Sequence, residues 1–314
     1  MVTRAFACAV TLAAVTLACT AAAPGPVPSS PQPVETGTPA AGGKGAPANP
    51  QQPGGASPSP SATTGPPNDP CGGLGRLLAT LNRPTIGYSA CAIPPGAIVL
   101  EEGYQNTVQR GPAAAVQVAF PQGFERFGVT NRFELDAIGP NDNLVRAGGV
   151  VSHGFNDLGL GFKYELPPKG RFIYGVDGLF TAASGASGFT GGGPSETLDV
   201  DIAYAASPSV GVGTTLAASS SSGAAANRSF ARYGFALPSL VLTAQIPHEY
   251  QFYAEVVAQT KLAPGQGGRV FTDFGLQKLL GEYLEVDAEY GADFTPVFGS
   301  QFHYFGIGTG IRVR

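Results

Sequence analysis

Apolar and polar residues alternate with a period of two along much of the chain after residue 97. Between residues 283 and 294, Leu284, Val286 and Tyr290 fall on one side of an extended strand, and acidic residues fall between them. Successive side chains of a strand point to opposite faces, so each such stretch is apolar on one side and charged or small on the other. The same period recurs at 131–137, 158–166, 198–204 and 251–262. The pattern predicts an all-β, antiparallel body over residues 97–314.

The length of the alternating stretches favours a membrane barrel over a soluble sandwich, which also alternates. Many of them run for about 9–12 residues, close to the roughly 9–11 that a tilted membrane-spanning strand needs. Strands of globular proteins are usually about five or six residues long. The chain has no apolar run of about 20 residues that could form a spanning helix, and a closed barrel also satisfies every backbone group in lipid. We therefore expect a transmembrane β-barrel with its apolar side chains toward lipid and its polar ones toward a lumen.

The strand count follows from the alternation and from the turn residues between the stretches. One break, at Pro238, can be a bend within a single strand, and merging its two sides leaves about twelve strands, an even number that suits a bacterial barrel. Gly139–Asp142, Pro167–Gly170 and Pro264–Gly268 have the composition of turns. The candidate strands lie at about 97–108, 113–122, 127–139, 156–167, 171–184, 196–207, 209–221, 230–237, 240–247, 250–262, 269–280, 283–294 and 302–314.

The N-terminal part has a different composition. Residues 1–19 resemble an export signal, with Arg4 as its positive region and an apolar stretch after it that includes Cys8. Cys19 follows Leu17 and Ala18 as in a bacterial lipoprotein signal, so it is either a lipidation site or is lost or left free after cleavage. Residues 20–70 are rich in proline, have no aromatic residue and show no hydrophobic period. Such a segment cannot bury enough apolar area to fold, and we expect a disordered linker.

A short segment at residues 71–96 joins this linker to the strands. Leu74, Leu77, Leu78 and Leu81 have helical spacing, and Pro84 ends the predicted helix. Cys71 and Cys91 are the only cysteines after the linker, and in an exported chain such a pair predicts a disulfide. A metal site would need more ligands than this segment offers.

Composition and charge exclude several function classes. Charged residues make up 13% of the chain, and the formal net charge is −4. A nucleic-acid-binding protein would show a basic patch. His153, His248 and His303 are scattered, and the chain contains no H-E-x-x-H, G-x-S-x-G or P-loop motif. We therefore expect no enzyme, no cofactor, no metal site and no nucleic-acid partner. A barrel-embedded hydrolase is the alternative that motifs do not test, because its Ser and His would meet only in the folded chain.

The polar faces of the predicted strands carry many acids and few bases. Lining a lumen, they would create a negative field that favours cations or neutral polar solutes; the alternative is that they only keep the lumen wet and pair with one another. The candidate lumen-lining residues are Arg132, Glu134, Asp136, Lys163, Glu165, Asp177, Asp199, Asp201, Glu255, Lys261, Asp273, Glu285, Asp287, Glu289 and Asp293.

Four stretches carry a resemblance to a known family: Asn156–Tyr164, Tyr253–Val256, Leu284–Gly291 and Tyr304–Arg314. Together with the order of the strands, they resemble outer-membrane proteins linked to the meta-cleavage pathway of phenol degradation, which are described as transporters. The resemblance covers about residues 97–314 and implies an outer-membrane barrel inserted by the barrel insertion machinery. Barrels of this kind usually end in an aromatic residue that the machinery reads, whereas this chain ends in Arg314.

Two functions fit these expectations. The first is an outer-membrane channel or transporter for small solutes, aromatic or hydrophobic ones included, with residues 71–96 near its mouth or partly plugging it. The second is a structural or anchoring envelope protein whose barrel is filled and does not conduct. The expected partners are the lipid bilayer, the insertion machinery and an unidentified small solute. A third interpretation of the sequence is a secreted, soluble β protein.

Overall fold

The computed structural model describes residue 71 and residues 76–111, 114–224, 230–294 and 301–313. The predicted signal, the linker, Cys8, Cys19, Leu74 and Arg314 lie outside these residues. The elements are α1 (Arg76–Thr80), β1 (Ile98–Arg110), β2 (Ala115–Ala119), β3 (Phe124–Gly128), β4 (Phe133–Ile138), β5 (Asp142–Ala147), β6 (Val150–Phe155), β7 (Gly159–Glu165), β8 (Phe172–Thr181), β9 (Ser195–Ser207), β10 (Val210–Ala224), β11 (Phe230–Ile246), β12 (Tyr250–Gln259), β13 (Arg269–Leu280), β14 (Leu284–Asp293) and β15 (Gln301–Arg312). No helix within the described residues is long and apolar enough to cross a membrane.

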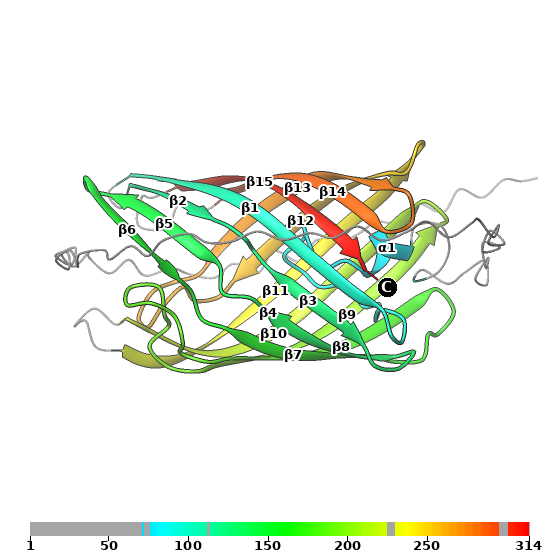
Figure 1. Ribbon diagram of the computed structural model, residues 1–314, viewed down its shortest axis with the longest axis horizontal. Coiled ribbons are helices and arrows are strands. Elements are labelled where there is room, and N and C mark those ends of the chain that lie inside the picture. Colours follow the sequence, from blue (N-terminus) through cyan, green and yellow to red (C-terminus); the bar gives the residue numbers. More distant parts are fainter. Residues whose placement is uncertain (1–70, 72–75, 112–113, 225–229, 295–300, 314) are drawn as a thin grey trace, which may run out of the picture.

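The strands form one antiparallel sheet that closes into a barrel (Figure 1). From β8 to β15 each strand pairs with the next one along the chain, and β15 pairs with β1 from Val99↔Arg312 to Arg110↔Gln301. The wall has 12 strand positions, as the sequence predicts. The apparent break at Pro238 is a bend within one strand, because β11 runs without interruption from Phe230 to Ile246.

Three neighbouring wall positions are each built from two short strands. β1 pairs with β3 over Ile98–Glu101 and with β2 over Gln105–Gln109, so β2 and β3 together form the next wall position. β4 with β5 and β7 with β6 form the following two. Pro121 and Pro140 interrupt the first two positions, because proline has no N–H to donate to a ladder. At the third, the side chain of Asn156 accepts the N–H of Asn141 at 2.5 Å in place of regular pairing.

These interruptions correct the predicted boundaries of three strands. The second wall position continues to residue 128, the third runs from 133 to 147, and the fourth begins at 150. The Gly139–Asp142 stretch is an interruption inside a wall position and not a turn. The hairpin turn lies instead at Gly148 and Gly149, whose φ angles of 56° and 80° suit a two-residue hairpin.

One edge of the wall is completed by a loop. Within the described residues β6 pairs with β5 alone, and the loop at 182–194 lies beside it. The N–H of Ala186 donates to the carbonyl of Phe155 at 2.8 Å. The carboxylate of Asp157 accepts the N–H groups of Gly185 and Gly191 at 2.7 and 2.8 Å. Asp157 therefore holds this loop against the gap between β6 and β8.

The two faces of the wall differ as the alternation predicts. Leu160 and Leu240 on the outer face are 61% and 52% exposed, whereas Lys163 and Glu255 on the inner face are 0% and 1% exposed. A soluble sandwich would bury its apolar faces against each other, so the fold is a barrel that is apolar outside and polar inside.

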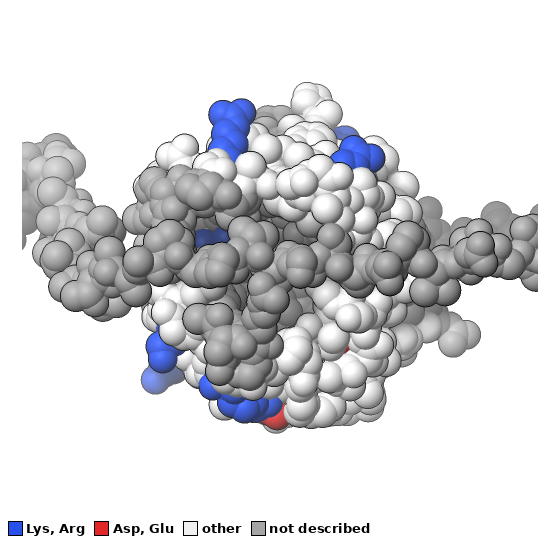
Figure 2. All heavy atoms as spheres, turned by 90° about the vertical axis from the view of Figure 1, so that its left-hand side faces the viewer, with Lys and Arg blue, Asp and Glu red and all other residues white. Residues whose placement is uncertain are grey.

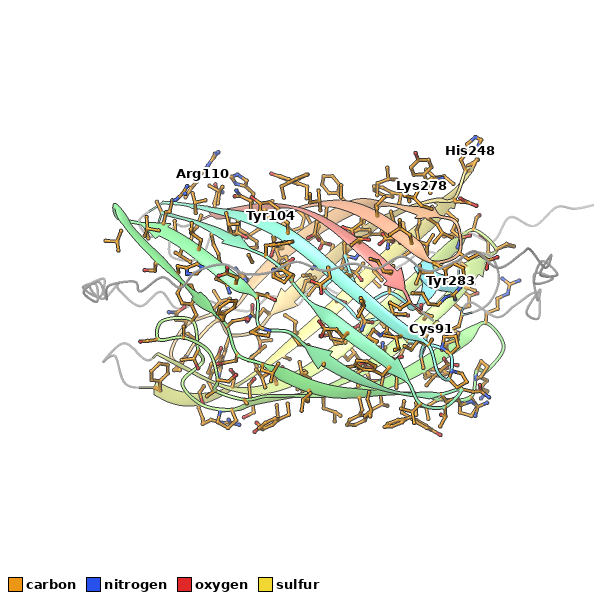
Figure 3. The ribbon with its side chains drawn as sticks, viewed as in Figure 1. Cys91, Tyr104, Arg110, His248, Lys278 and Tyr283 are labelled. Atoms are coloured by element: carbon orange, nitrogen blue, oxygen red, sulfur yellow. A yellow bond between two sulfur atoms is a disulfide. The ribbon has the colours of Figure 1, made fainter. Side chains whose placement is uncertain are left out.

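The two ends of the barrel differ in their connections. Short turns at 129–132, 208–209, 247–249 and 281–283 lie at one end, called here the short-turn end, which is on the right in Figure 1. Longer loops at 182–194 and 260–268 lie at the other, the long-loop end. Arg110 and His248 project from opposite ends of the wall, and Cys91 lies within it (Figure 3).

Candidate functional site

The segment before β1 folds inside the barrel near the short-turn end. We call Cys71 with residues 76–96 the plug. The apolar side of α1 packs against the wall in a buried cluster. The cluster consists of Leu77, Leu78, Leu81, Ile93, Ala97, Val99 and Leu279. The predicted disulfide is present, with the Cα atoms of Cys71 and Cys91 5.6 Å apart, and it packs on Ala90 and on Ile173 of β8.

Carboxylates of the wall hold the backbone of the plug. Glu101 of β1 accepts the N–H groups of residues 82 and 83 at 2.9 and 2.7 Å. Glu255 of β12 accepts those of residues 86 and 87 at 2.7 and 2.8 Å. Glu165 and Glu134 accept the N–H groups of residues 92 and 93 at 2.9 and 2.6 Å. Hydrogen bonds to a charged acceptor are stronger than neutral ones, so these acids fix the position of the plug.

Two buried bases compensate part of this negative charge. The guanidinium of Arg126 on β3 lies 3.1 Å from Glu101 and 2.6 Å from Glu134, and it also donates to the carbonyl of Thr80. The ammonium of Lys163 on β7 lies 3.3 Å from Asp177 and donates to Asn82 and to the carbonyl of Ser89. Both bases therefore connect wall acids to the plug.

A second group of acids lies across the lumen, beside β15. Tyr304 donates to Asp273 at 2.8 Å, and Arg83 of the plug lies 3.8 Å from Glu289. The inner face of β15 carries Gly308 and Gly310 at this level, where a Cβ would lie 2.6 Å from Asp287 or Leu81. The absence of side chains there makes room for both the acids and the plug.

The structure places most of the predicted lumen-lining residues on the inner face of the wall. Two of them lie elsewhere: Arg132 is in the turn between β3 and β4, Lys261 is in the loop between β12 and β13, and both are exposed. The inner-face residues of the predicted set are Glu134, Asp136, Lys163, Glu165, Asp177, Asp199, Asp201, Glu255, Asp273, Glu285, Asp287, Glu289 and Asp293.

Several residues of the site were not in the predicted set. Glu101 has the inner-face parity of its strand, so the alternation could have identified it. Arg126 fell between two predicted strands, and Arg83 and Tyr88 belong to the plug, whose position no local pattern gives. Burial beside Asp199 and Asp177 raises the pKa of Tyr88, so its hydroxyl stays neutral.

The long-loop half of the interior has a different lining. Many of its inner-face positions carry uncharged side chains such as Gln105, Thr107 and Ser219, and an aromatic group on β13 and β15 lies beside Asp293. The guanidinium carbon of Arg269 lies 5.3 and 4.5 Å from the ring centres of Phe271 and Phe302. The charged side chains visible on this end are mostly basic (Figure 2).

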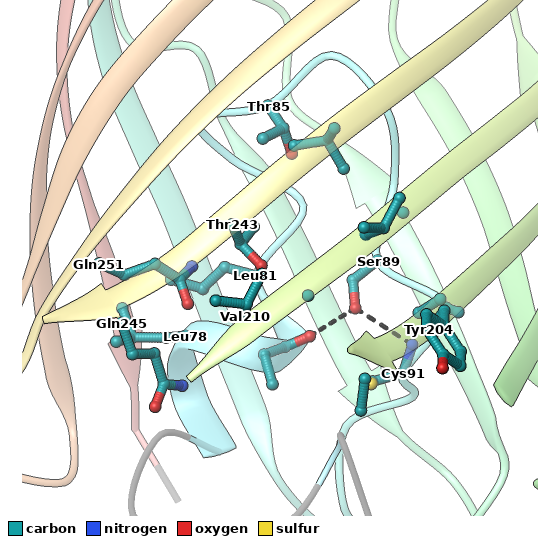
Figure 4. Close-up of a pocket in the computed structure, with 18 of the residues that line it drawn as sticks. Leu78, Leu81, Thr85, Ser89, Cys91, Tyr204, Val210, Thr243, Gln245 and Gln251 are labelled. Carbon is teal, nitrogen blue, oxygen red and sulfur yellow. Dashed lines mark hydrogen bonds between the residues drawn. The ribbon is translucent and has the colours of Figure 1, made fainter. Parts of the chain in front are cut away.

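A cavity of about 180 Å³ lies between the plug and the wall at the short-turn end (Figure 4). It is bounded by residues 78–91 of the plug, by β9, β10 and β11, and by Gln251 and Gln277. Residues 85–88 form part of its boundary, and they are held in place by Glu255 and by Thr215, which accepts the N–H of Tyr88 at 2.9 Å. Among the described residues, no group of three or more His, Cys, Asp or Glu side chains could hold a metal ion.

Comparisons with known proteins support the fold. The chain matches no protein-family model and shows no significant similarity to a curated protein. Among solved structures, an outer-membrane channel from Pseudomonas putida F1 is 15% identical with a TM-score of 0.51, and the match covers 71% of this chain and 97% of that one. The NanC porin is 11% identical with a TM-score of 0.47, over 68% and 100% of the two chains. The CymD monoaromatic hydrocarbon channel is 12% identical with a TM-score of 0.37, over 70% and 89%. At 15% identity the likeness to the Pseudomonas putida channel is one of fold, the closed barrel.

Proposed function

We propose that this protein is an outer-membrane channel for small solutes, in which the plug restricts the passage. The outer face is largely apolar, with exposed residues such as Leu160 and Leu240, and this suits hydrocarbon. The barrel closes between β15 and β1, and the loop at 182–194 lies beside the edge of β6. In bacterial barrels the short turns face the periplasm, so the plug lies at the periplasmic mouth. The lipid bilayer and the barrel insertion machinery are the partners that this location requires.

One observation carries the proposal: residues 85–88 of the plug border the cavity at the periplasmic mouth through Thr85, Gly87 and Tyr88, and hydrogen bonds to the wall hold them there. The rest of the plug is fixed by its apolar cluster, the disulfide and the bonds to Glu101, Glu134 and Glu165. Residues 85–88 are tied to the wall by hydrogen bonds to Glu255 and Thr215, which two substitutions can remove. In this proposal, displacement of this short stretch widens the passage.

The second candidate is the structural or anchoring role, with a filled barrel that does not conduct. It is favoured by the number of charged hydrogen bonds between wall and plug, which suit a permanent filling. The finer assignment, to transport of aromatic solutes linked to the meta-cleavage pathway of phenol degradation, rests on the sequence resemblance and is part of this proposal.

Planar-bilayer conductance distinguishes the two candidates. We expect the wild-type protein to give small, steady currents. The double variant Thr215→Val, Glu255→Ala removes the acceptors that hold residues 85–88, so its currents should be several-fold larger. Glu249→Ala, in the exposed turn after β11, is the matched control and should behave as wild type. Absence of steady current from both the wild type and the double variant would support the filled, anchoring barrel instead.

A further inference from the structure

We propose that the cavity beside the plug is a binding site for small uncharged molecules that carry a hydrogen-bonding group. This inference rests on the proposed channel function and assigns its solute class. The cavity opens at the periplasmic mouth, where Gln245 and Gln251 lie at its edge and Thr243 lies deeper, with Ser89 on the plug side (Figure 4).

The size of the cavity sets an upper limit on the solute. Its volume of about 180 Å³ is similar to that of an engineered apolar cavity of about 150 Å³ that binds benzene. The space exists because β9 and β10 present small residues on their inner faces here, among them Ala205, Gly211 and Gly213. A Cβ on Gly213 would lie 2.8 Å from the side chain of Val241. The site therefore accommodates a molecule of about the size of a single six-membered ring.

The lining combines apolar and uncharged polar groups. Leu78 and Leu81 of the plug and Val241 of β11 supply apolar surface, and Thr243, Gln245, Gln251 and Gln277 supply hydroxyl and amide groups. The side chain of Gln251 donates to that of Gln277 at 2.8 Å, which orients the pair. Ligand sites typically combine an apolar lining with a few placed polar groups that select the ligand.

The same lining disfavours ions. Among the residues that line the cavity, all of them in the described part of the chain, Arg83 alone carries a formal charge. Its guanidinium donates through Nη1 to Gln122 at 2.8 Å, and its Nη2 lies 3.8 Å from Glu289, which compensates part of its charge. No acid is among these lining residues; of the acids behind them, Glu255 holds the plug backbone, and one oxygen of Asp201 accepts from Thr215 at 2.5 Å. A cation would therefore lose hydration without a carboxylate in the lining, and an anion would meet only a guanidinium that already lies beside Glu289; such a loss costs several kcal/mol.

The acids of the wall therefore do not make this a cation site. Several of them bind the plug, and apart from Arg83 the residues that line the space beside it are uncharged. Of the two solute classes that the negative inner face suggested, the cavity favours the neutral one.

Thiol accessibility tests the proposal on the full-length protein in lipid vesicles. Thr243→Cys places a nearly isosteric thiol in the cavity, and Tyr283→Cys places one in the exposed turn before β14 as the control. Both are treated with three methanethiosulfonates of matched size, the neutral hydroxyethyl, the cationic aminoethyl and the anionic sulfonatoethyl reagents, and modification is followed by mass. The unsubstituted chain corrects for any thiol at Cys8 or Cys19.

We expect the hydroxyethyl reagent to modify both thiols at comparable rates. Relative to the control thiol, the two charged reagents should modify Thr243→Cys at least about tenfold more slowly. A tenfold change in rate corresponds to only about 1.4 kcal/mol, which is less than the cost of placing an ion in the cavity. Equal relative rates for the aminoethyl or sulfonatoethyl reagent would overturn the solute class. Failure of all three at Thr243→Cys, with normal reaction at Tyr283→Cys, would overturn the cavity as a site. Neither result depends on conductance, so the outcome is separable from the test of the channel itself.

Discussion

Arg126 and Glu134 form a fully buried ion pair on neighbouring strands, with Nη2 of the guanidinium 2.6 Å from Oε1 of the carboxylate. The second oxygen of Glu134 accepts the N–H of Ile93 at 2.6 Å. One carboxylate thus joins β3, β4 and the plug. The pair explains why a base stands on an inner face that is otherwise rich in acids.

Replacement of Arg126 by methionine should strongly destabilise this end of the barrel. Removal of one partner leaves Glu101 and Glu134 buried without compensation, and breaking a buried pair in this way typically costs about 3–5 kcal/mol. The measurement is the temperature at which the folded, fast-migrating band is lost on a gel. Arg132→Met, in an exposed turn, is the control and should leave that temperature unchanged. An equal effect of the two substitutions would contradict the role given to Arg126.

Truncation of a side chain in the apolar cluster should destabilise the plug without destabilising the barrel. Leu77 is 2% exposed and packs with Leu81 and Val99. Leu77→Ala should cost about 2–5 kcal/mol of plug stability, as other large-to-small core changes do. Hydrogen exchange should quicken at the amides of residues 81–93 and stay unchanged in β9–β12. Leu280→Ala, on the outer face of β13, should alter neither. Uniform acceleration throughout the barrel would argue against a separately docked plug.

Loss of the Cys71–Cys91 disulfide should have a similar but milder effect. The bond links residues separated by 20 positions, and closing a loop of that size stabilises by about 3 kcal/mol in the chain-entropy model. Cys71→Ser should therefore increase protease cleavage within residues 76–93 while the barrel remains resistant. Reducing agent should reproduce the effect in the wild type and add nothing to the variant. Cleavage that is the same with and without the bond would show that the other contacts alone hold the plug.

The outer face should tolerate charge only near its ends. Leu240 lies in the middle of β11 and Ile246 at its last residue, and both side chains are exposed. Arginine at the bilayer midplane of a barrel costs about 2–4 kcal/mol and about 0–1 near the interface. Leu240→Arg should therefore make folding into vesicles less favourable, which urea titration measures as a smaller free energy of unfolding. Ile246→Arg should change that free energy little. Equal effects at the two sites would contradict a hydrocarbon belt centred on Leu240.

Asp157 should control the order of the loop that covers the edge of β6. Its carboxylate holds two loop amides, those of Gly185 and Gly191. In Asp157→Ala these amides should exchange with solvent at least several-fold faster, as should the amide of Ala186. Asp142→Ala, at the start of β5, is the comparison and should spare them. Unchanged exchange at Gly185 and Gly191 would mean that the loop is held by other contacts.

The sequence by itself determined the class of fold and much of the wall. The period of two is a local property, because neighbouring side chains of a strand must face opposite sides, and it correctly separated Leu160 from Lys163 and Val256 from Glu255. Helical spacing of leucines likewise predicted the helix around Leu77, and the presence of a single cysteine pair after the linker predicted the Cys71–Cys91 bond. The boundaries near Pro121 and Pro140 were wrong, since a proline that interrupts a wall strand has the same local signature as one in a turn.

Only the tertiary structure decided what the inner face does. Glu101, Glu134 and Glu255 lie far apart in sequence, and their shared role appears only when closure of the barrel brings them around the plug. Arg126 and Arg83 gave no local signal for the same reason. The pattern could place acids on a face but could not show that several of them hold the plug, because that role depends on a segment far away in the sequence.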